Sequence, residues 1–174
     1  YSYGGNQLAL AIDAATPLAS CRPGLLARPP QTWEDLLDLA RQGRVAVPGI
    51  AVYSLMHAMM LCQSDVLTED ALLKLRGLYD LCPRECLDWN PIRVHEAMCQ
   101  RDDLWYCPFA YGYSNYSRNE YARTRLEFGD VVDGIATTLG GTGLAISRHC
   151  PHRDAALEYA RYVASPECQR TVYW

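Results

Sequence analysis

The decisive stretch of this sequence is Pro29-Pro30-Gln31-Thr32-Trp33-Glu34-Asp35-Leu36. The prolines indicate a loop, and Thr32 is a residue type that caps helix N-termini. Glu34 and Asp35 place negative charge in the first turn, where the helix dipole favours it. Apolar residues at helical spacing follow, and Gly43 is a natural stop. The stretch therefore predicts a helix that begins after Thr32 and turns one face toward a core.

Three other positions carry the same kind of helix start. Thr68 precedes a segment with leucines at helical spacing, and Asn90-Pro91 combines a cap with proline at the first helical position. Ser165-Pro166 repeats that combination near the end of the chain. Residues 154–164 form an amphipathic pattern that predicts another helix. Residues 52–62 are apolar nearly all round and predict a buried helix.

Short apolar runs between these helices predict strands. They lie at residues 7–12, 18–21, 45–47, 103–107, 126–132 and 139–147, the last with a glycine-rich entry. The segment 108–120 is rich in turn formers and tyrosines and predicts a loop. Strands and helices alternate through most of the chain, which favours an α/β layer on a mainly parallel or mixed sheet.

Composition limits the classes of function. The chain has 174 residues, 21% of them charged, and a net charge of -4, which argues against nucleic acid as the main partner. Apolar runs stay well below the length of about 18 residues that would cross a bilayer. The sequence starts at Tyr1 without a methionine and stops at Trp174 within a helical pattern. We therefore expect a piece excised from a longer protein.

The cysteines and the catalytic-looking motifs have structural explanations. Most of the eight cysteines lie in apolar stretches and are expected as buried thiols, with a disulfide at Cys82 or Cys86 and a zinc site as alternatives. The segment His95-Glu96-Ala97-Met98-Cys99 has cysteine where a helical zinc protease needs its second histidine. Residues 140–143 are glycine-rich but lead into a strand, unlike a phosphate cradle. We expect no catalytic residue, no metal and no cofactor.

Tyrosine is unusually frequent, with twelve residues against two phenylalanines. Four of them, Tyr106, Tyr111, Tyr113 and Tyr116, crowd into one segment. A tyrosine ring combines a flat apolar face with a hydroxyl, so a cluster in a loop suggests a binding surface.

Four segments in fixed order resemble the extracellular solute-binding proteins of bacterial ABC importers, in the branch that takes up sugars. They are residues 3–17, with Tyr-Gly-Gly leading to Ala-Leu-Ala-Ile-Asp-Ala-Ala-Thr-Pro; the helix start 29–36; residues 107–115, Cys-Pro-Phe-Ala-Tyr-Gly-Tyr-Ser-Asn; and residues 140–169, from Gly-Gly-Thr-Gly to Ser-Pro-Glu-Cys-Gln. The Pro-Pro-x-Thr-Trp-Glu-Asp and Ser-Pro-Glu-x-Gln helix starts are the most specific. The resemblance spans nearly the whole chain.

The resemblance implies a two-lobed protein of the periplasmic-binding-protein type II fold, of which this chain is a central fragment. Each lobe is expected to be α/β, with a mixed sheet flanked by helices. Residues 1–138 are then most of the second lobe together with the first hinge strand. Residues 139–174 are the returning hinge strand and helices of the first lobe.

The resemblance also implies a binding site in the cleft between the lobes. Asp13 corresponds to a carboxylate after the first hinge strand that accepts hydrogen bonds from hydroxyls. Tyr111 and Tyr113 correspond to an aromatic platform for a sugar ring, and the list of expected ligand contacts is completed by Asn115, Tyr116 and Thr142. The residues themselves leave other roles open: Asp13 as a turn cap, the tyrosines as lobe packing and Asn115 as a support of its own loop.

The function that the resemblance implies is capture of a small polar solute, a carbohydrate, by a monomeric, non-enzymatic protein that delivers it to a membrane permease. It places the protein in the periplasm or outside the cell, with tethering to the membrane as one option. A ligand sensor on the same fold, an enzyme on a related two-lobed scaffold and a cytoplasmic location remain alternatives. Eight cysteines would be unusual in an oxidising compartment unless they are paired or buried.

Overall fold

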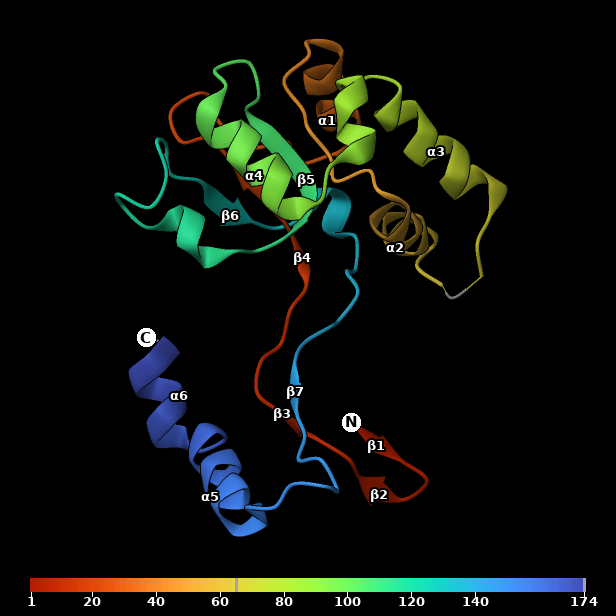
Figure 1. The fold of residues 1–174 in the computed structure, drawn as a ribbon. Coiled ribbons are helices and arrows are strands. Elements are labelled where there is room, and N and C mark those ends of the chain that lie inside the picture. The colour runs from red at the N-terminus through yellow and green to blue at the C-terminus, as the bar shows by residue number, and fades with distance from the viewer. Residues whose placement is uncertain (65, 174) are drawn as a thin grey trace. The chain divides into compact units, whose positions relative to one another are not determined.

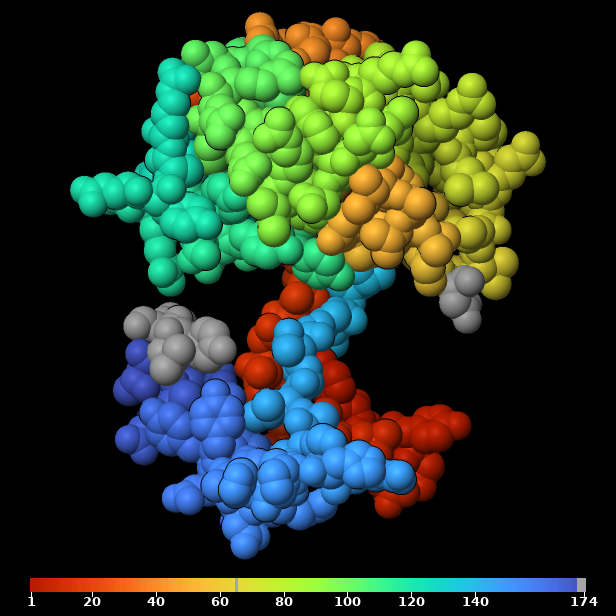
Figure 2. Space-filling model, viewed as in Figure 1, coloured from red at the N-terminus to blue at the C-terminus, as the bar shows by residue number. Residues whose placement is uncertain are grey.

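The computed structural model describes residues 1–64 and 66–173; Trp174, where the sequence pattern predicts a helix, lies outside them. The chain divides into two compact units, residues 1–15 with 139–174 (unit 1) and residues 16–138 (unit 2). Whether these units are parts of two different lobes stays a prediction. Figures 1 and 2 show the fold as a ribbon and as a space-filling view.

Unit 2 is built on a three-stranded antiparallel sheet with the order β5-β4-β6. The strands are β4 (Pro17–Cys21), β5 (Tyr106–Tyr111) and β6 (Glu127–Gly129). Val45 adds an isolated parallel bridge to Tyr106. The named strand pairs of the described residues are all antiparallel, so the mainly parallel sheet that the sequence analysis favoured as one alternative is not formed among them. Strand β5 continues through Pro108, where the sequence analysis placed a loop. Proline is tolerated there because β5 is an edge of the three-stranded sheet and does not need every N–H group.

Helices surround this sheet. They are α1 (Trp33–Arg41), α2 (Ala51–Cys62), α3 (Glu69–Tyr79) and α4 (Pro91–Gln100), with short 3-10 helices η1 (Arg84–Asp88), η2 (Ser114–Ser117) and η3 (Val132–Gly134). Figure 1 shows α2 beside α3, and α4 against β5. The core between helices and sheet includes Leu36, Val94, Met98, Tyr106 and Phe109, all fully buried.

The helix starts are where the sequence predicts them. The hydroxyl of Thr32 accepts the Asp35 N–H at 3.1 Å and the Asp35 carboxylate accepts the Thr32 N–H at 3.1 Å, which makes a capping box. Thr68 accepts the Ala71 N–H at 3.3 Å, and Asn90 accepts the Arg93 N–H at 2.9 Å. Each cap satisfies a backbone donor that has no partner within its helix.

The prediction of a helix buried all round at residues 52–62 is wrong. Helix α2 forms over these residues, but the side chains of Val52 and Leu55 are 64% and 51% exposed. Its buried side is formed by His57, Ala58 and Met60. The apolar character of a helix therefore does not by itself show how much of it is covered.

Unit 1 contains short strands and two helices. Strand β1 (Ser2–Tyr3) pairs with β2 (Asn6–Gln7), and β3 (Leu10–Ala11) pairs with β7 (Gly143–Leu144), both antiparallel. The helices are α5 (Arg153–Val163) and α6 (Pro166–Tyr173). The prediction of a buried strand at residues 7–12 is wrong, because β3 is a two-residue strand and the preceding Leu8 is 59% exposed.

The remaining strand predictions need shorter bounds. Residues 45–47 are fully buried as a central segment would be, but their only assigned pairing among the described residues is the Val45 bridge. Within residues 126–132 the strand is limited to β6, and η3 follows it. Within residues 139–147 the strand is β7.

Gly49 is expected to be sensitive to substitution, because an alanine Cβ there would lie 2.6 Å from the Cys86 carbonyl oxygen and 2.8 Å from Leu87 Cα. The Gly49 N–H donates to the same carbonyl at 2.9 Å, so the two segments cannot separate freely. We expect Gly49→Ala to lower the free energy of unfolding by about 2–3 kcal/mol in urea denaturation.

Gly77 is the matched control, because it lies within α3 and its added Cβ would meet open space. Gly77→Ala is expected to raise the free energy of unfolding by about 0.5–1 kcal/mol, since alanine is the better helix former. Equal effects of the two substitutions would contradict the close approach at Gly49.

Candidate functional site

Two tyrosines from different elements of unit 2 meet at the end of β5. Tyr53 lies in the first turn of α2 and Tyr111 is the last residue of β5; their ring centroids are 6.3 Å apart at 72°. The Tyr111 hydroxyl donates to Met56 Sδ at 3.6 Å. Partial burial raises the pKa of Tyr53, and the nearby phenols of Tyr113 and Tyr111 raise it further. We call Tyr53, Tyr111 and Tyr113 the tyrosine cluster.

The chain turns sharply after Tyr111, which places Tyr113 close behind it. The Tyr113 N–H donates to the Tyr111 carbonyl at 2.9 Å, and the Tyr116 N–H donates to the Tyr113 carbonyl at 3.0 Å as η2 begins. Gly112 lies between the two tyrosines, and an added Cβ would come within 2.8 Å of Leu18 Cδ1. A small residue between the tyrosines lets the loop follow the end of β4 closely.

The other residues predicted in this loop have different environments. Tyr113 is 37% exposed and Asn115 is exposed, whereas Tyr116 is 6% exposed. The Tyr116 ring packs against His95 at 5.2 Å and Tyr121 at 5.3 Å, and burial raises its pKa to about 12. Tyr116 thus lies in the core. Of the other predicted contacts in this segment, Tyr113 and Asn115 are exposed and Tyr111 is half-buried.

His95 supports this loop from α4. Its ring is fully buried and lies edge to face with Tyr113 at 6.2 Å and with Phe128 at 5.5 Å. Neither ring nitrogen has a hydrogen-bond partner within the described residues. Burial lowers the pKa of His95 to about 4, so the ring is neutral near pH 7 and packs as an apolar group.

In unit 1, the predicted residues Asp13 and Thr142 contact each other. The Thr142 N–H donates to Asp13 Oδ1, and the Ile12 N–H donates to the Thr142 carbonyl at 3.0 Å. Both side chains are exposed. The second carboxylate oxygen of Asp13 can therefore accept hydrogen bonds from another molecule while the first anchors the returning strand.

Gly141 is required for this arrangement. Its φ is +151°, and an added Cβ would lie 2.5 Å from the Asp13 carbonyl oxygen and 3.1 Å from Asp13 Oδ1. We expect Gly141→Ala to separate residues 13 and 142 and to make the Thr142 amide exchange at least about tenfold faster, as the loss of one charge-assisted hydrogen bond predicts. Amide exchange followed by NMR checks this, and unchanged protection of Thr142 would contradict the contact.

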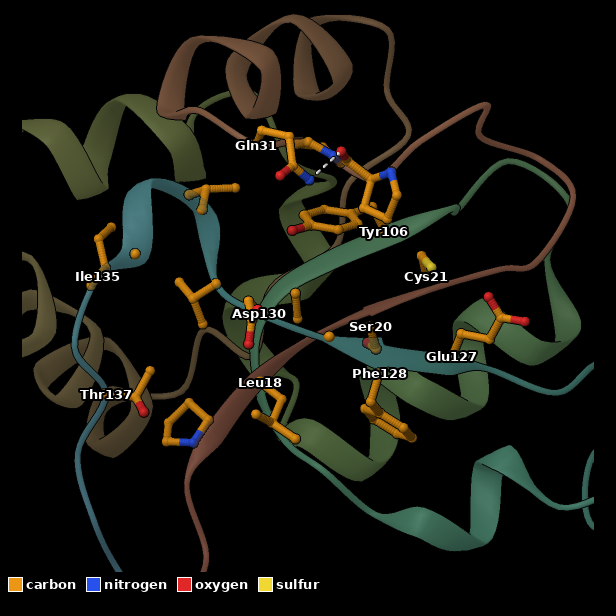
Figure 3. Close-up of a pocket in the computed structure, with 18 residues that line it drawn as sticks. Leu18, Ser20, Cys21, Gln31, Tyr106, Glu127, Phe128, Asp130, Ile135 and Thr137 are labelled. Atoms are coloured by element: carbon orange, nitrogen blue, oxygen red, sulfur yellow. Dashed lines mark hydrogen bonds between the residues drawn. The ribbon is translucent and has the colours of Figure 1, made fainter.

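A cavity of about 560 Å³ lies elsewhere in unit 2, beside β4 and β6. Its walls include Leu18, Gln31, Asp130 and Ile135, which Figure 3 labels. The Gln31 side chain donates to the Pro29 carbonyl at 3.1 Å and so is held by its own loop. The six predicted ligand contacts are absent from the residues that line this cavity.

The candidate metal ligands and the cysteines have the following environments. The described residues contain no group of three or more His, Cys, Asp or Glu side chains placed to hold a metal ion. All eight cysteines are free thiols, so the alternative of a disulfide at Cys82 or Cys86 is not realised. Burial raises the pKa of Cys86 and of Cys99 to about 11, which keeps these thiols protonated and unreactive at neutral pH.

The sequence analysis missed Tyr53. Most residues of α2 are apolar, and the ring contact with Tyr111 joins residues 58 positions apart, which no local pattern reveals. The available signal was its position just after Pro48-Gly49, where a helix begins and its first turn is open to solvent.

In the described part of the chain, no helix has the length and apolar character needed to span a membrane.

Known structures with this fold are numerous, although no family model and no curated protein matches the sequence. Maltose-bound MalE3 of T. maritima superimposes with a TM-score of 0.77 at 18% identity over 97% of this chain and 53% of that chain. A ribitol-bound ABC transporter solute-binding protein of Agrobacterium radiobacter K84 has a TM-score of 0.74 at 16% identity, over 97% of this chain and 52% of that chain. A tagatose-bound ABC transporter solute-binding protein of Thermotoga lettingae TMO has a TM-score of 0.73 at 18% identity, over 94% of this chain and 51% of that chain.

These matches confirm the predicted fold class, including the expectation of a periplasmic-binding-protein-like arrangement of α/β elements. Identities below 20% show likeness of fold and do not by themselves transfer a ligand. The chain has the fold of ABC transporter solute-binding proteins and spans about half the length of the solved structures that it matches.

Proposed function

We propose that the protein containing this chain is the solute-binding component of an ABC importer and that it captures a neutral carbohydrate or polyol. The observation that carries the proposal is the tyrosine cluster, displayed at the end of β5 on a fold whose solved relatives hold maltose, tagatose and ribitol. The cluster is independent of those relatives, because it is a property of this chain's own residues.

The chemistry of the cluster suits a sugar. The C–H face of a pyranose or an extended polyol is apolar and packs on an aromatic ring, while its hydroxyls pair with polar groups at the ring edge. Tyr53 and Tyr111 lie at 72° to each other, so they offer two differently oriented faces for such contacts. Their hydroxyls, together with Tyr113 and Asn115, provide donors and acceptors that match hydroxyl groups.

In unit 1, Asp13 and Thr142 remain proposed ligand contacts. The carboxylate of Asp13 is an acceptor that prefers a donor such as a sugar hydroxyl over an anion. Tyr116 remains in the proposed set as a support of the loop, since its ring lies in the core. The protein would act without catalysis or cofactor, as a monomer outside the cytoplasm, and would hand the solute to a membrane permease.

A thermal-shift panel on the full-length protein tests this function. Maltose, tagatose, ribitol and mannitol are the probes, and spermidine and a mixture of amino acids are the controls. A solute at 100 times its dissociation constant stabilises a protein by roughly 2.7 kcal/mol, which is readily detected. The proposal predicts a shift with at least one sugar or polyol. A shift with spermidine or an amino acid and with no sugar would contradict it.

A further inference from the structure

Gln63 has an unusual backbone conformation at the end of α2. Its φ is 50° and its ψ is 31°, the left-handed region that glycine adopts most easily at helix ends. Its N–H still donates to the Met60 carbonyl at 3.2 Å, which closes the last turn of α2. Glycine or asparagine would make this cap with less strain, so the glutamine side chain must be considered for a role of its own.

The Gln63 side chain caps its own helix, because its Nε2 donates to the Met60 carbonyl at 2.5 Å. It also makes a reciprocal pair of hydrogen bonds with one distant residue. Its Nε2 donates to the Ala136 carbonyl at 3.2 Å, and its Oε1 accepts the Ala136 N–H at 3.3 Å. The two residues are 73 positions apart in the sequence. A primary amide paired in this way with a peptide group reproduces the geometry of a strand-to-strand contact, and both backbone groups of Ala136 are satisfied by it.

Ala136 is close to the point where the chain leaves unit 2. Unit 2 ends at Thr138, and unit 1 resumes at Leu139, whose side chain is 81% exposed. The Thr137 hydroxyl is hydrogen-bonded to the hydroxyl of Thr16, where the chain enters unit 2. On the unit 1 side, pairing begins with Ala15 and Gly140, whose backbones exchange hydrogen bonds of 3.1 and 2.7 Å.

We propose that Gln63 is a clamp that fixes residues 135–137 to the end of α2, so that hinge motion of the protein bends the chain after Thr137. The clamp leaves Thr138 and Leu139 as the residues between the last fixed point of unit 2 and the first paired residue of unit 1. The hinge role rests on the proposed solute-binding function, whereas the clamp does not. Hinges of this kind are a few residues at the ends of elements that absorb the backbone change.

Two substitutions separate the clamp from the helix cap. Gln63→Gly relieves the left-handed backbone and removes the side chain. Gln63→Asn keeps an amide and tolerates the left-handed region, but it is one methylene too short to reach Ala136. If Gln63 were only a cap, both variants would lose the hydrogen bond to Met60 but would leave the exchange of the Ala136 amide unchanged. The clamp predicts that both variants lower the melting temperature and also speed the exchange of the Ala136 amide, because residues 135–137 lose their attachment.

Hydrogen exchange of the full-length protein without solute gives the direct readout. We expect the Ala136 amide to exchange about fivefold faster in both variants, the equivalent of one net hydrogen bond. Gln42→Ala is the matched control, because Gln42 caps α1 and its side chain bonds to Asp38 in its own helix at 3.1 Å. Unchanged exchange at Ala136, or a higher melting temperature in either Gln63 variant, would overturn the clamp.

The same measurement with the stabilising sugar from the panel tests the hinge. In the wild type, adding the sugar is expected to change the amide exchange rates at residues 138–142 and to leave those at residues 131–137 unchanged. In Gln63→Asn, the sugar is expected to change the rates at residues 131–137 as well. Changes across 131–137 in the wild type would overturn the pivot after Thr137. If no sugar or polyol binds, the proposed function fails, and the exchange of Ala136 without solute still decides the clamp.

Discussion

Between pH 6.5 and pH 4.5 the protein is expected to lose about 5 kcal/mol of unfolding free energy through two buried histidines. His57 and His95 are both fully buried. Burial lowers the pKa of His57 to about 3 and that of His95 to about 4, from 6.5. Below pH 6.5 the two histidines therefore bind protons in the unfolded chain and stay neutral in the folded chain, so the free energy of unfolding falls as the pH falls.

The pH range of this loss of stability follows from these pKa values. The loss begins near pH 6.5, the pKa of the unfolded side chains, and levels off only as the pH reaches the folded values near 4 and 3. Carboxylates whose pKa is lowered in the folded protein, such as Asp103 beside Arg101, add their loss mainly below about pH 4.5. Urea denaturation at half-unit pH steps separates the two ranges.

His95→Leu is expected to remove about half of the slope between pH 6.5 and 4.5, because it deletes one of the two titrating groups. At pH 7 the variant should fold with similar stability, since neither nitrogen of His95 has a partner to lose within the described residues. His152→Gln is the control, because that side chain is exposed. A stability that stays flat from pH 6.5 to 4.5 would contradict the burial of both rings.

The second large effect is expected at Tyr111. Replacing it by alanine removes the ring that contacts Tyr53, and we expect the affinity for the panel's best sugar to fall about 30-fold, or about 2 kcal/mol. Tyr111→Phe keeps the ring and loses the hydroxyl, which donates to the Met56 sulfur at 3.6 Å and is one of several polar groups proposed to meet the solute. Its loss of affinity should therefore stay within about fivefold. Titration calorimetry on the full-length protein measures both.

Tyr159→Ala is the matched control, because Tyr159 is an exposed tyrosine on α5, outside the tyrosine cluster. Its affinity should equal that of the wild type. Wild-type affinity in a folded Tyr111→Ala protein would mean that the sugar does not rest on this ring. Equal losses in Tyr111→Ala and Tyr111→Phe would show that the hydroxyl, and not the aromatic face, makes the contact.

Helix starts were predictable because the information for them is local. Thr32, Thr68 and Asn90 each cap a helix within three residues of themselves, and the structure confirms all three. Strands were less predictable, because pairing depends on segments far apart in sequence. Pro108 illustrates this, since whether proline fits a strand depends on that strand being an edge, which the sheet order decides.

The candidate site shows the same division. The tyrosine-rich segment was visible from composition, and the resemblance pointed to Tyr111 and Tyr113. Tyr116 is buried in the core, and the fold adds Tyr53, a residue of α2 that precedes the segment by more than 50 positions. The exposed face of α2 was also beyond the sequence, because the apolar residues Val52 and Leu55 gave no sign of which side would be covered.

The most direct test of the account is a crystal structure of the full-length protein with the sugar or polyol that gives the largest thermal shift. The account predicts that carbon atoms of the solute lie within about 4 Å of the Tyr111 ring, with Tyr53 or Tyr113 forming a second wall. Solute bound in the cavity lined by Leu18, Gln31 and Asp130, or away from all three tyrosines, would contradict it.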